Sequence, residues 1–505
     1  MKYTMNILKV TLLAFLVTFW SCMDLEEVPL TRISPASYYQ TPEQCMSIIV
    51  SAAQLVVQDH PGYADGSQRT QLNWNIRFQN SVWNNHYRSI NNLNPVIKVI
   101  LDGNLDSYDK NTVNDILGQA YFLRAFNHFQ LVRLYGKILY LDEDYPDLVA
   151  NPPTPESREE ISVVYDKIEA DLLKAQEIIG KNANPAIPNV WAVKSLLARV
   201  YINRATAPLN QADYYAKARD AAEDVLTNSP YSFEPKITEI FNIANKNKNQ
   251  EYIWTYNSAD DNPRGNGQWP GPDEWDVWGA HDAEGLWADR FPNQPRKWYY
   301  VLSVFPSNLY DDEDDWDWLK WGNSEDTRPF QAKFMWPNVP REIHENNDYY
   351  HPVNPVFRYT ELLLIYAEAA NKANGGPTQL AVDRLNMVID RGNAPFPSPF
   401  DNCKNSNAEL NAILVAAHVS TSIAGTEPQA TMSMSVDEFD KRVITEREWE
   451  LCFEKESYFD VLRKRRLQEQ AELNLDKTFE EYRYLFPIPA ADVSFIGQNP
   501  GYLVE

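Results

Sequence analysis

The chain has 505 residues and a formal net charge of −24, with 44% apolar and 13% aromatic residues. This composition excludes a disordered chain, and so acidic a protein is a poor partner for nucleic acid, whose phosphates need clustered Lys and Arg. None of the four cysteines has the spacing of a metal site, so we expect buried thiols at Cys45 and Cys452 and no disulfide framework.

The N-terminus has the pattern of a secretory signal. An apolar run from Val10 to Trp20 follows basic residues and is too short to span a bilayer. The next two residues, Ser21 and Cys22, are similar to the lipobox of bacterial lipoproteins, in which the chain is cut before a cysteine that becomes lipidated. We therefore expect a lipoprotein signal peptide over residues 1–21 and lipidation of Cys22. The alternative is an ordinary signal peptide with an incidental cysteine.

Most of the remaining chain has the periodicity of amphipathic or buried helices. The pattern predicts helices over residues 44–59, 81–101, 113–135, 157–179, 190–205, 213–226, 358–372, 378–391 and 436–466. Several of them fall in pairs, such as 157–179 with 190–205, and the pair over 358–391 has the length of a tetratricopeptide helix pair, about 34 residues. Helix pairs of a repeat bury one face on their neighbours, which explains helices that are apolar on more than one side.

Two stretches lack this periodicity. Residues 60–78 are loop-like, and residues 255–356 are long and rich in Pro, Gly, Asp and Trp. Ten of the 15 tryptophans lie between Trp254 and Trp336. Loops this long in a compact domain are usually functional, and loops on a rigid scaffold often carry binding residues.

Six ordered segments carry a family resemblance. They are GQAYFLRAFNHFQLVRLYG (118–136), AVKSLLARVYI (192–202), FRYTELLLIYAEAAN (357–371), EREWELCFEKESYFDVLR (446–463), YLFPIPAADV (484–493) and QNPGY (498–502). Behind a lipobox-like cysteine, they resemble the SusD/RagB family of outer-membrane nutrient-binding lipoproteins. Two departures are Lys455, where the family has Gly, and Ser457, where it usually has Arg.

The resemblance implies a mostly α fold, in which a scaffold of tetratricopeptide-like helix pairs carries a loop-rich, Trp-rich second region. The SusD-like domain would span 22–505, with the scaffold in 22–254 and 357–505 and a variable ligand-binding region in 255–356. It also implies a lipid-anchored protein at the cell surface of the outer membrane, which binds oligosaccharide or polysaccharide and delivers it to a SusC-like TonB-dependent transporter. Catalysis and an obligatory cofactor are not expected.

Charged residues in the helical motifs have a structural interpretation. Glu446, Glu450 and Glu454 recur at every fourth position, which is typical of an ion-paired or solvated helix face rather than of acid–base chemistry. Three arginines, Arg124, Arg358 and Arg463, lie in or beside apolar helices. Since a buried Arg needs a carboxylate partner, we expect scaffold ion pairs at these positions.

The candidate ligand-binding residues are aromatic and polar residues of the two irregular stretches. Indole faces suit the polarised C–H bonds of sugar rings, and amides or charged groups bind hydroxyls. These criteria select Asn73, Trp74, Arg77, Trp269, Trp275, Trp278, Trp287, Trp316, Trp318 and Trp321. For any single tryptophan, burial in the core of the loop is the alternative.

Three other interpretations stay open. The acidic run at 311–315, DDEDD, offers oxygen ligands for a structural Ca²⁺ but lacks EF-hand spacing. A peptide or glycopeptide could replace the glycan as ligand, because acidic loops favour cationic peptides. Finally, the aromatic loops could serve as a structural lid that packs on the transporter barrel.

Overall fold

The computed structural model describes residues 38–58, 76–181, 187–241, 249–256, 354–395, 426–454, 456–469 and 480–502, with 287, 290–292, 294–302, 304–306, 318–320, 330–331 and 333 between them. Helices dominate these residues. The longer ones are α2 (Pro42–Gln58), α3 (Ile76–Leu101), α4 (Lys110–Tyr135), α5 (Ile161–Ile178), α6 (Val190–Ala205), α7 (Tyr214–Asn228), α12 (Tyr359–Asn374), α13 (Gln379–Asn393), α15 (Val436–Glu450) and α16 (Glu456–Arg463). The shorter ones are η3 (Pro155–Ser157), α8 (Ile237–Ile240), α10 (Pro295–Tyr300), η6 (Glu481–Tyr484) and α18 (Ala490–Ile496).

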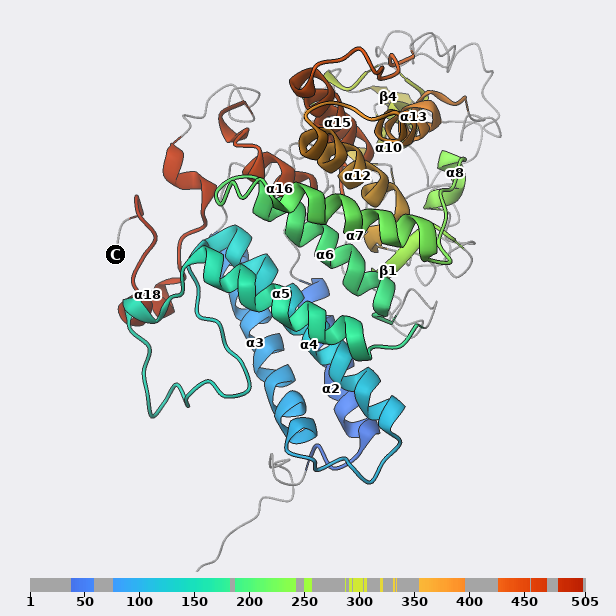
Figure 1. Ribbon diagram of the computed structural model, residues 1–505. Helices are drawn as coiled ribbons and strands as arrows, with labels where there is room; N and C mark the ends of the chain where they lie inside the picture. The colour runs from blue at the N-terminus through green and yellow to red at the C-terminus, as the bar shows by residue number, and fades with distance from the viewer. Residues whose placement is uncertain are drawn as a thin grey trace, which may run out of the picture.

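The long helices form a layered array in which neighbours in the chain are neighbours in space (Figure 1). Each helix from α2 to α7 packs on the next one, and α2 also packs on α4. The array then continues through α12, which packs on α7, α13 and α15. The helix pairs predicted over 157–205 and 358–391 therefore do pack as pairs, and the predicted mostly α scaffold is confirmed.

Helix α4 explains why parts of the sequence are apolar on every side. All its residues from Ile116 to Tyr135 are buried, because α2, α3, α5 and α6 surround it. An asparagine starts the equally buried α6: Asn189 accepts hydrogen bonds from the backbone N–H groups of Trp191 and Ala192 at 2.9 and 3.1 Å. Tertiary packing, rather than an amphipathic stripe, holds these two helices in place.

Replacing Gly118 with alanine should lower the free energy of unfolding by about 1–3 kcal/mol, because α4 and the end of α5 meet at this glycine. An added Cβ would lie 2.7 Å from Cβ of Ile179 and 3.0 Å from its backbone. The matched control is Gly376→Ala, where no heavy atom lies within 4 Å of the added Cβ. Urea unfolding of both variants tests the prediction, and equal midpoints for the two would contradict it.

The helix predicted over 436–466 is wrong in one respect, since the structure divides it into α15 and α16. Helix α15 ends at Glu450, and Phe453 has a φ of 64°, a left-handed value that no helix continues. The physical reason is a contact from a distant part of the chain: the Nζ atom of Lys333 donates hydrogen bonds to the carbonyl oxygens of Glu450 and Cys452. Lys455 lies outside the described residues.

Short antiparallel strand pairs frame the region between α8 and α12. Strand β1 (Tyr252–Tyr256) pairs with β6 (Asn354–Arg358), β2 (Val301–Leu302) with β5 (Phe330–Gln331), and β3 (Val304–Pro306) with β4 (Trp318–Lys320). The chain thus leaves the helical scaffold on β1 and returns to it on the neighbouring β6. The boundaries predicted for the irregular region, 255 and 356, fall within these two strands, and the region's extent and its role as a ligand-binding unit stay predictions.

Two further expectations can be compared with the described residues. Cys45 and Cys452 are buried free thiols, as predicted, and burial raises the pKa of Cys45 to about 11. Among the helices described, none combines the length and the apolar character needed to cross a bilayer.

Candidate functional site

The structure describes only some of the predicted ligand-binding residues. Outside the described residues lie Asn73, Trp74, Trp269, Trp275, Trp278, Trp316 and Trp321, as does the predicted lipidation site Cys22. Arg77 belongs to α3 and Trp318 to β4, but only the backbone is described at these two positions. The contact of these residues with a ligand therefore stays a prediction.

Trp287 is the candidate whose side chain is described, and it lies in the core with an exposed fraction of 0%. Its ring packs on Phe291, Trp449 and Phe453, with ring centroids 5.4, 5.7 and 5.6 Å apart. An indole enclosed in this way has no face to offer to a sugar. We therefore remove Trp287 from the candidate set and assign it to the packing between the irregular region and the turn after α15.

The irregular region is anchored in the core where it begins and where it ends. Trp254 of β1 is buried and contacts Phe122 and Phe126 of α4 edge to face, with centroids 4.9 and 5.4 Å apart. It also stacks on Phe357 of β6 at 6.0 Å. Two segments about a hundred residues apart in the chain are thereby fixed to the same scaffold helix.

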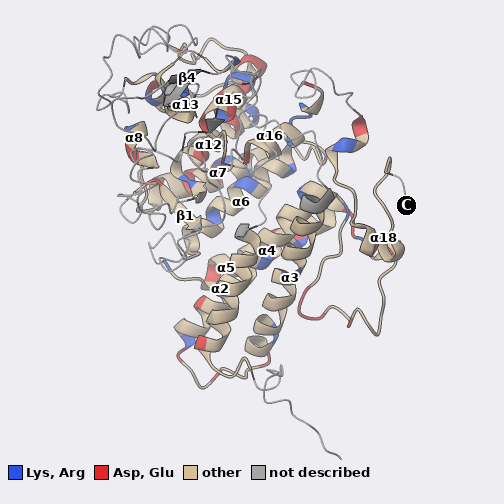
Figure 2. Cartoon of the chain, turned by 180° about the vertical axis from the view of Figure 1, so that it is seen from behind, with Lys and Arg blue, Asp and Glu red and all other residues tan. Residues whose placement is uncertain are grey.

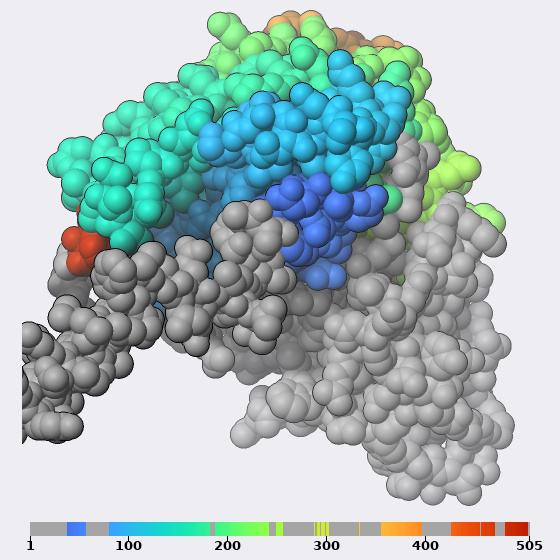
Figure 3. Space-filling view, turned by 90° about the horizontal axis from the view of Figure 1, so that it is seen from below, coloured from blue at the N-terminus to red at the C-terminus, as the bar shows by residue number. Residues whose placement is uncertain are grey.

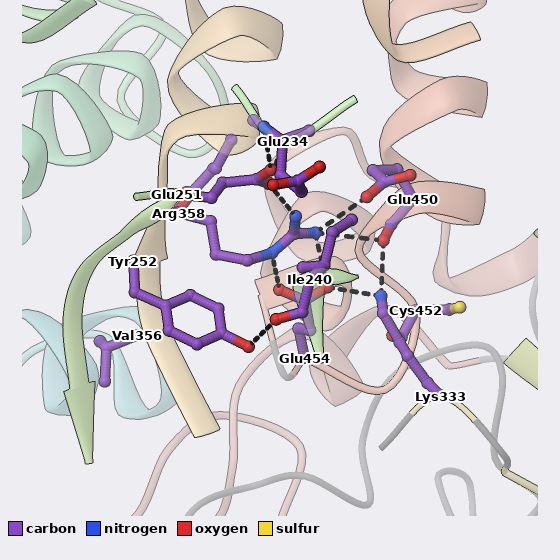
Figure 4. Close-up of polar contacts among 12 residues, drawn as sticks. Glu234, Ile240, Glu251, Tyr252, Lys333, Val356, Arg358, Glu450, Cys452 and Glu454 are labelled. Atoms are coloured by element: carbon purple, nitrogen blue, oxygen red, sulfur yellow. Dashed lines mark hydrogen bonds and ion pairs between the residues drawn. The ribbon is translucent and has the colours of Figure 1, made fainter. Parts of the chain in front are cut away.

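A cluster of buried charges lies beside this anchor, with Arg358 at its centre (Figure 4). The Nε atom of Arg358 lies 2.6 Å from Glu454, and its terminal nitrogens lie 2.5 Å from Glu251 and 3.1 Å from Glu450. Lys333 completes the set through an ion pair with Glu454. The predicted scaffold ion pair of Arg358 is confirmed, with three carboxylates rather than one.

Two more arginines complete the cluster from α13 and α10. Arg391 lies 2.7 Å from Glu251 and 2.8 Å from Glu450, while Arg296 lies 2.6 Å from Glu446 and 2.9 Å from Glu450. Acidic and basic residues accordingly lie next to one another around α12 and α15 (Figure 2). The predicted glutamate ladder is ion-paired: Glu446 and Glu450 are buried, and the side chain of Glu454 is 6% exposed.

The charge cluster keeps its carboxylates ionised. Burial alone would raise the pKa of Glu450, but Arg391, Arg358 and Arg296 outweigh it and hold the pKa below its usual range. Burial would likewise raise the pKa of Glu251, but Arg391 and Arg358 outweigh it and lower that pKa. These groups are paired with cations and shielded from solvent, so the arrangement suits a structural joint and not proton transfer to a ligand.

Lys333 ties the irregular region directly to the scaffold. Its Nζ atom lies 2.6 Å from the carbonyl oxygen of Glu450 and 2.9 Å from that of Cys452, at the C-terminal end of α15, where a cation is favoured. The side chain is fully buried. Sequence reasoning missed this residue, because a single lysine in an irregular stretch has no signal for a partner more than a hundred residues away.

The other two predicted ion-paired arginines are also confirmed. Arg124 of α4 binds Asp171 of α5 through Nε at 2.7 Å and Glu143 through a terminal nitrogen at 2.5 Å. Arg463 of α16 binds Glu368 of α12 at 2.6 Å and Asp460 at 2.6 Å. The Arg124–Asp171 and Arg463–Glu368 pairs each join two helices, so these arginines stabilise the scaffold.

An open groove on the opposite, N-terminal part of the scaffold lies between α3, the segment 139–153 and α18. We call it the α3 groove. Its volume is about 790 Å³, within the range of ligand pockets. Helix α18 contacts η3. In Figure 3 the C-terminal part of the chain (red) borders a teal part of the surface.

An array of helix pairs with one anchored irregular region defines a scaffold protein of the helical-repeat class. Two family models match it: one described as "Starch-binding associating with outer membrane" over residues 36–202, and the SusD family model over residues 319–502. The chain belongs to the SusD/RagB family, as the sequence motifs predict.

Known relatives agree with this assignment over almost the whole chain. SusD-like protein P2 of Formosa agariphila is 24% identical, covering 98% of this chain and 99% of the relative. A SusD superfamily protein of Parabacteroides distasonis shares the fold with a TM-score of 0.71 and 21% identity, over 93% of this chain and 100% of that one.

Two similar structures have names that mention a glycan. The surface glycan-binding protein A of Bacteroides thetaiotaomicron has a TM-score of 0.63 and 16% identity, covering 92% of this chain and 100% of its own. A laminarin-binding SusD-like protein has a TM-score of 0.62 and 17% identity, covering 91% and 99%. At these identities the likeness establishes the fold.

Proposed function

We propose that this protein binds oligosaccharide or polysaccharide for nutrient uptake at the outer membrane, and that it is not an enzyme. The family assignment carries the proposal, because the model that matches residues 36–202 is described as starch-binding and associated with the outer membrane. The two structural relatives named for glycan or laminarin binding support it.

The finer parts of the proposal come from the sequence. Cys22 is the lipid attachment site after removal of residues 1–21, and the protein sits on the cell surface. There it passes the glycan to a SusC-like TonB-dependent transporter. The contact residues are the aromatic and polar candidates of residues 73–77 and 255–356, without Trp287. No cofactor is part of this proposal, and a structural Ca²⁺ at residues 311–315 stays a prediction.

The experiment is calorimetry on the chain from residue 23 onward against a panel of polysaccharides and peptides. A glycan should bind, and replacing both Trp316 and Trp318 with alanine should weaken it at least about tenfold, equivalent to about 1.4 kcal/mol. The reason is the loss of two rigid apolar platforms for sugar rings. Tyr108→Ala, at an exposed ring between α3 and α4, is the control and should not change affinity.

A peptide or glycopeptide ligand is the second candidate function. The net charge of −24 favours cationic peptides over anionic ones. If a cationic peptide binds and no polysaccharide of the panel produces heat, the ligand is a peptide and not a glycan. A chain that binds neither class would leave the structural lid as the remaining role.

A further inference from the structure

The α3 groove is lined by residues outside 255–356, so the proposed glycan binding in that region does not explain it. Helix α3 already holds one irregular segment of its own chain by side-chain hydrogen bonds. The hydroxyl of Tyr87 donates to the carbonyl oxygen of Leu139 at 3.0 Å. Asn94, seven residues further on, donates to the carbonyl oxygens of Leu141 and Asp142 at 3.1 Å each. Tyr87 and Asn94 thus form one row of α3 side chains that binds the backbone of residues 139–142.

A second row of polar side chains runs along α3 beside the first. Asn84, Arg88 and Asn91 line the groove, are exposed, and make no side-chain hydrogen bond or ion pair to any residue that the structure describes. Asn84 and Asn91 are seven residues apart, which is also the separation of Tyr87 and Asn94. Residues at this separation lie two turns apart on the same face of a helix. The free row therefore repeats the spacing of the row that binds residues 139–142.

The opposite wall of the groove is apolar and exposed. Leu148, Val149, Pro152 and Pro153 contribute one part of this wall and Phe495 of α18 another. Val149 is 89% exposed and Phe495 50% exposed, although large apolar side chains normally avoid water. Apart from Phe495, the wall consists of aliphatic and proline side chains, which fit apolar peptide side chains better than sugar rings, since these favour flat aromatic platforms.

The charge of the groove restricts its occupant further. Arg88 and Asp492 are the charged side chains among its lining residues, so it has no net charge in a chain of −24. Each asparagine amide offers both a donor and an acceptor, the combination that a peptide unit presents. The groove is thus complementary to backbone along one wall and to uncharged apolar side chains along the other.

We propose that the α3 groove docks an extended, uncharged segment of a partner protein. Asn84 and Asn91 pair with its backbone, and Val149 and Phe495 receive its apolar side chains. From Ser81 to Asn91 the helix rises about 15 Å, the length of four to five residues of an extended chain. This docking site goes beyond the proposed glycan function, and the two do not depend on each other.

The test is affinity selection of the chain from residue 23 onward against a library of capped hexapeptides without charged residues, followed by calorimetry on the selected peptides. Binding should fall at least tenfold in the double variant Asn84→Ala with Asn91→Ala, and also in Val149→Asp. The matched controls are Asn92→Ala on the same helix and Leu173→Asp at an exposed leucine of α5. Neither should alter affinity. The substituted residues are exposed except Asn92, which is partly buried, and circular dichroism checks that each variant folds.

The outcomes separate the docking site from the glycan function. Selection of no peptide, or of peptides whose affinity the groove variants do not change, overturns the docking site. A loss of glycan affinity in the groove variants would make the groove a carbohydrate subsite and would also overturn it. Peptides docked in the groove of a chain that binds no glycan would uphold the docking site and defeat the proposed function alone.

Discussion

Replacing Arg358 with methionine should lower the free energy of unfolding by about 3–5 kcal/mol, as expected when one partner of a buried ion cluster is removed. Arg358 donates to Glu251, Glu450 and Glu454, and all four side chains are nearly or fully buried. Methionine fills most of the volume but leaves the three carboxylates with less positive charge around them. Arg391, Arg296 and Lys333 still compensate in part, which keeps the loss from being larger.

Urea unfolding followed by tryptophan fluorescence measures this loss. Two further variants serve as comparisons. Arg219→Met removes a surface ion pair with Asp220 and should cost less than about 1 kcal/mol. Arg358→Lys keeps the charge but loses the planar fork that reaches three carboxylates, so its midpoint should lie between those of wild type and Arg358→Met. If Arg358→Met unfolds at the same midpoint as Arg219→Met, the cluster is not a stabilising joint.

The charge cluster joins segments that are far apart in the chain. Glu251 precedes β1, Arg358 ends β6, Arg391 lies in α13 and Glu450 ends α15, while Lys333 comes from the irregular region. Ligand-binding loops of a proposed glycan receptor need a rigid base, since every loop that orders on binding lowers affinity. The buried cluster supplies such a base without placing any of its charges at the surface.

Local signals in the sequence predicted much of the helical scaffold. The helix expected over 190–205 has the same bounds in the structure, because Asn189 caps its N-terminus locally. The helix expected over 436–466 divides in two because Lys333, from a distant part of the chain, donates hydrogen bonds to carbonyl groups at the end of α15. Buried arginines were predictable as ion-paired, since their apolar surroundings demand a carboxylate, although the identity of each partner was not.

The candidate site was less predictable, for a physical reason. Residue type shows that a tryptophan can stack on a sugar, but only packing decides whether its ring faces solvent. Trp287 is enclosed by Phe291, Trp449 and Phe453, of which Trp449 lies in the last turn of α15 and Phe453 in the turn that divides α15 from α16. The α3 groove had no signal either, because its amides come from α3 while its apolar wall comes from residues 148–153 and from Phe495 near the other end of the chain.

The stability of the protein should fall as the pH drops from 6.5 to 5, because α3 and α4 bury neutral histidines. Burial is the main reason that the pKa of His86 is lowered to about 4, with nearby Arg133 acting in the same direction. An unfolded histidine has a pKa of about 6.5, so the unfolded state binds more protons in this interval. His86 thus stabilises the fold fully above pH 6.5, and by pH 5 about 2 kcal/mol of that contribution is lost.

A second buried histidine should add to this dependence. Burial and the charge of Arg124 lower the pKa of His128, whose Nε2 atom accepts a hydrogen bond from the backbone N–H of Leu141 at 3.2 Å. Protonation of Nε2 would remove that acceptor. Carboxylates with lowered pKa, such as Glu368 beside Arg463, lose their contribution only as the pH falls below about 4.5, so the histidines dominate the interval above 5.

Urea unfolding at several pH values between 7.5 and 5 tests the histidines, with His86→Asn as the variant. In the protein, Asn127 donates its Nδ2 hydrogens to Ser89 and to the carbonyl oxygen of Leu123, so its Oδ1 atom accepts from Nδ1–H of His86 at 2.7 Å. An asparagine amide at position 86 can donate in the same way but takes up no proton. The variant should therefore lose about 2 kcal/mol less than wild type between pH 6.5 and 5, whatever its stability at pH 7.5. Parallel curves for the two proteins would mean that His86 is not the titrating group.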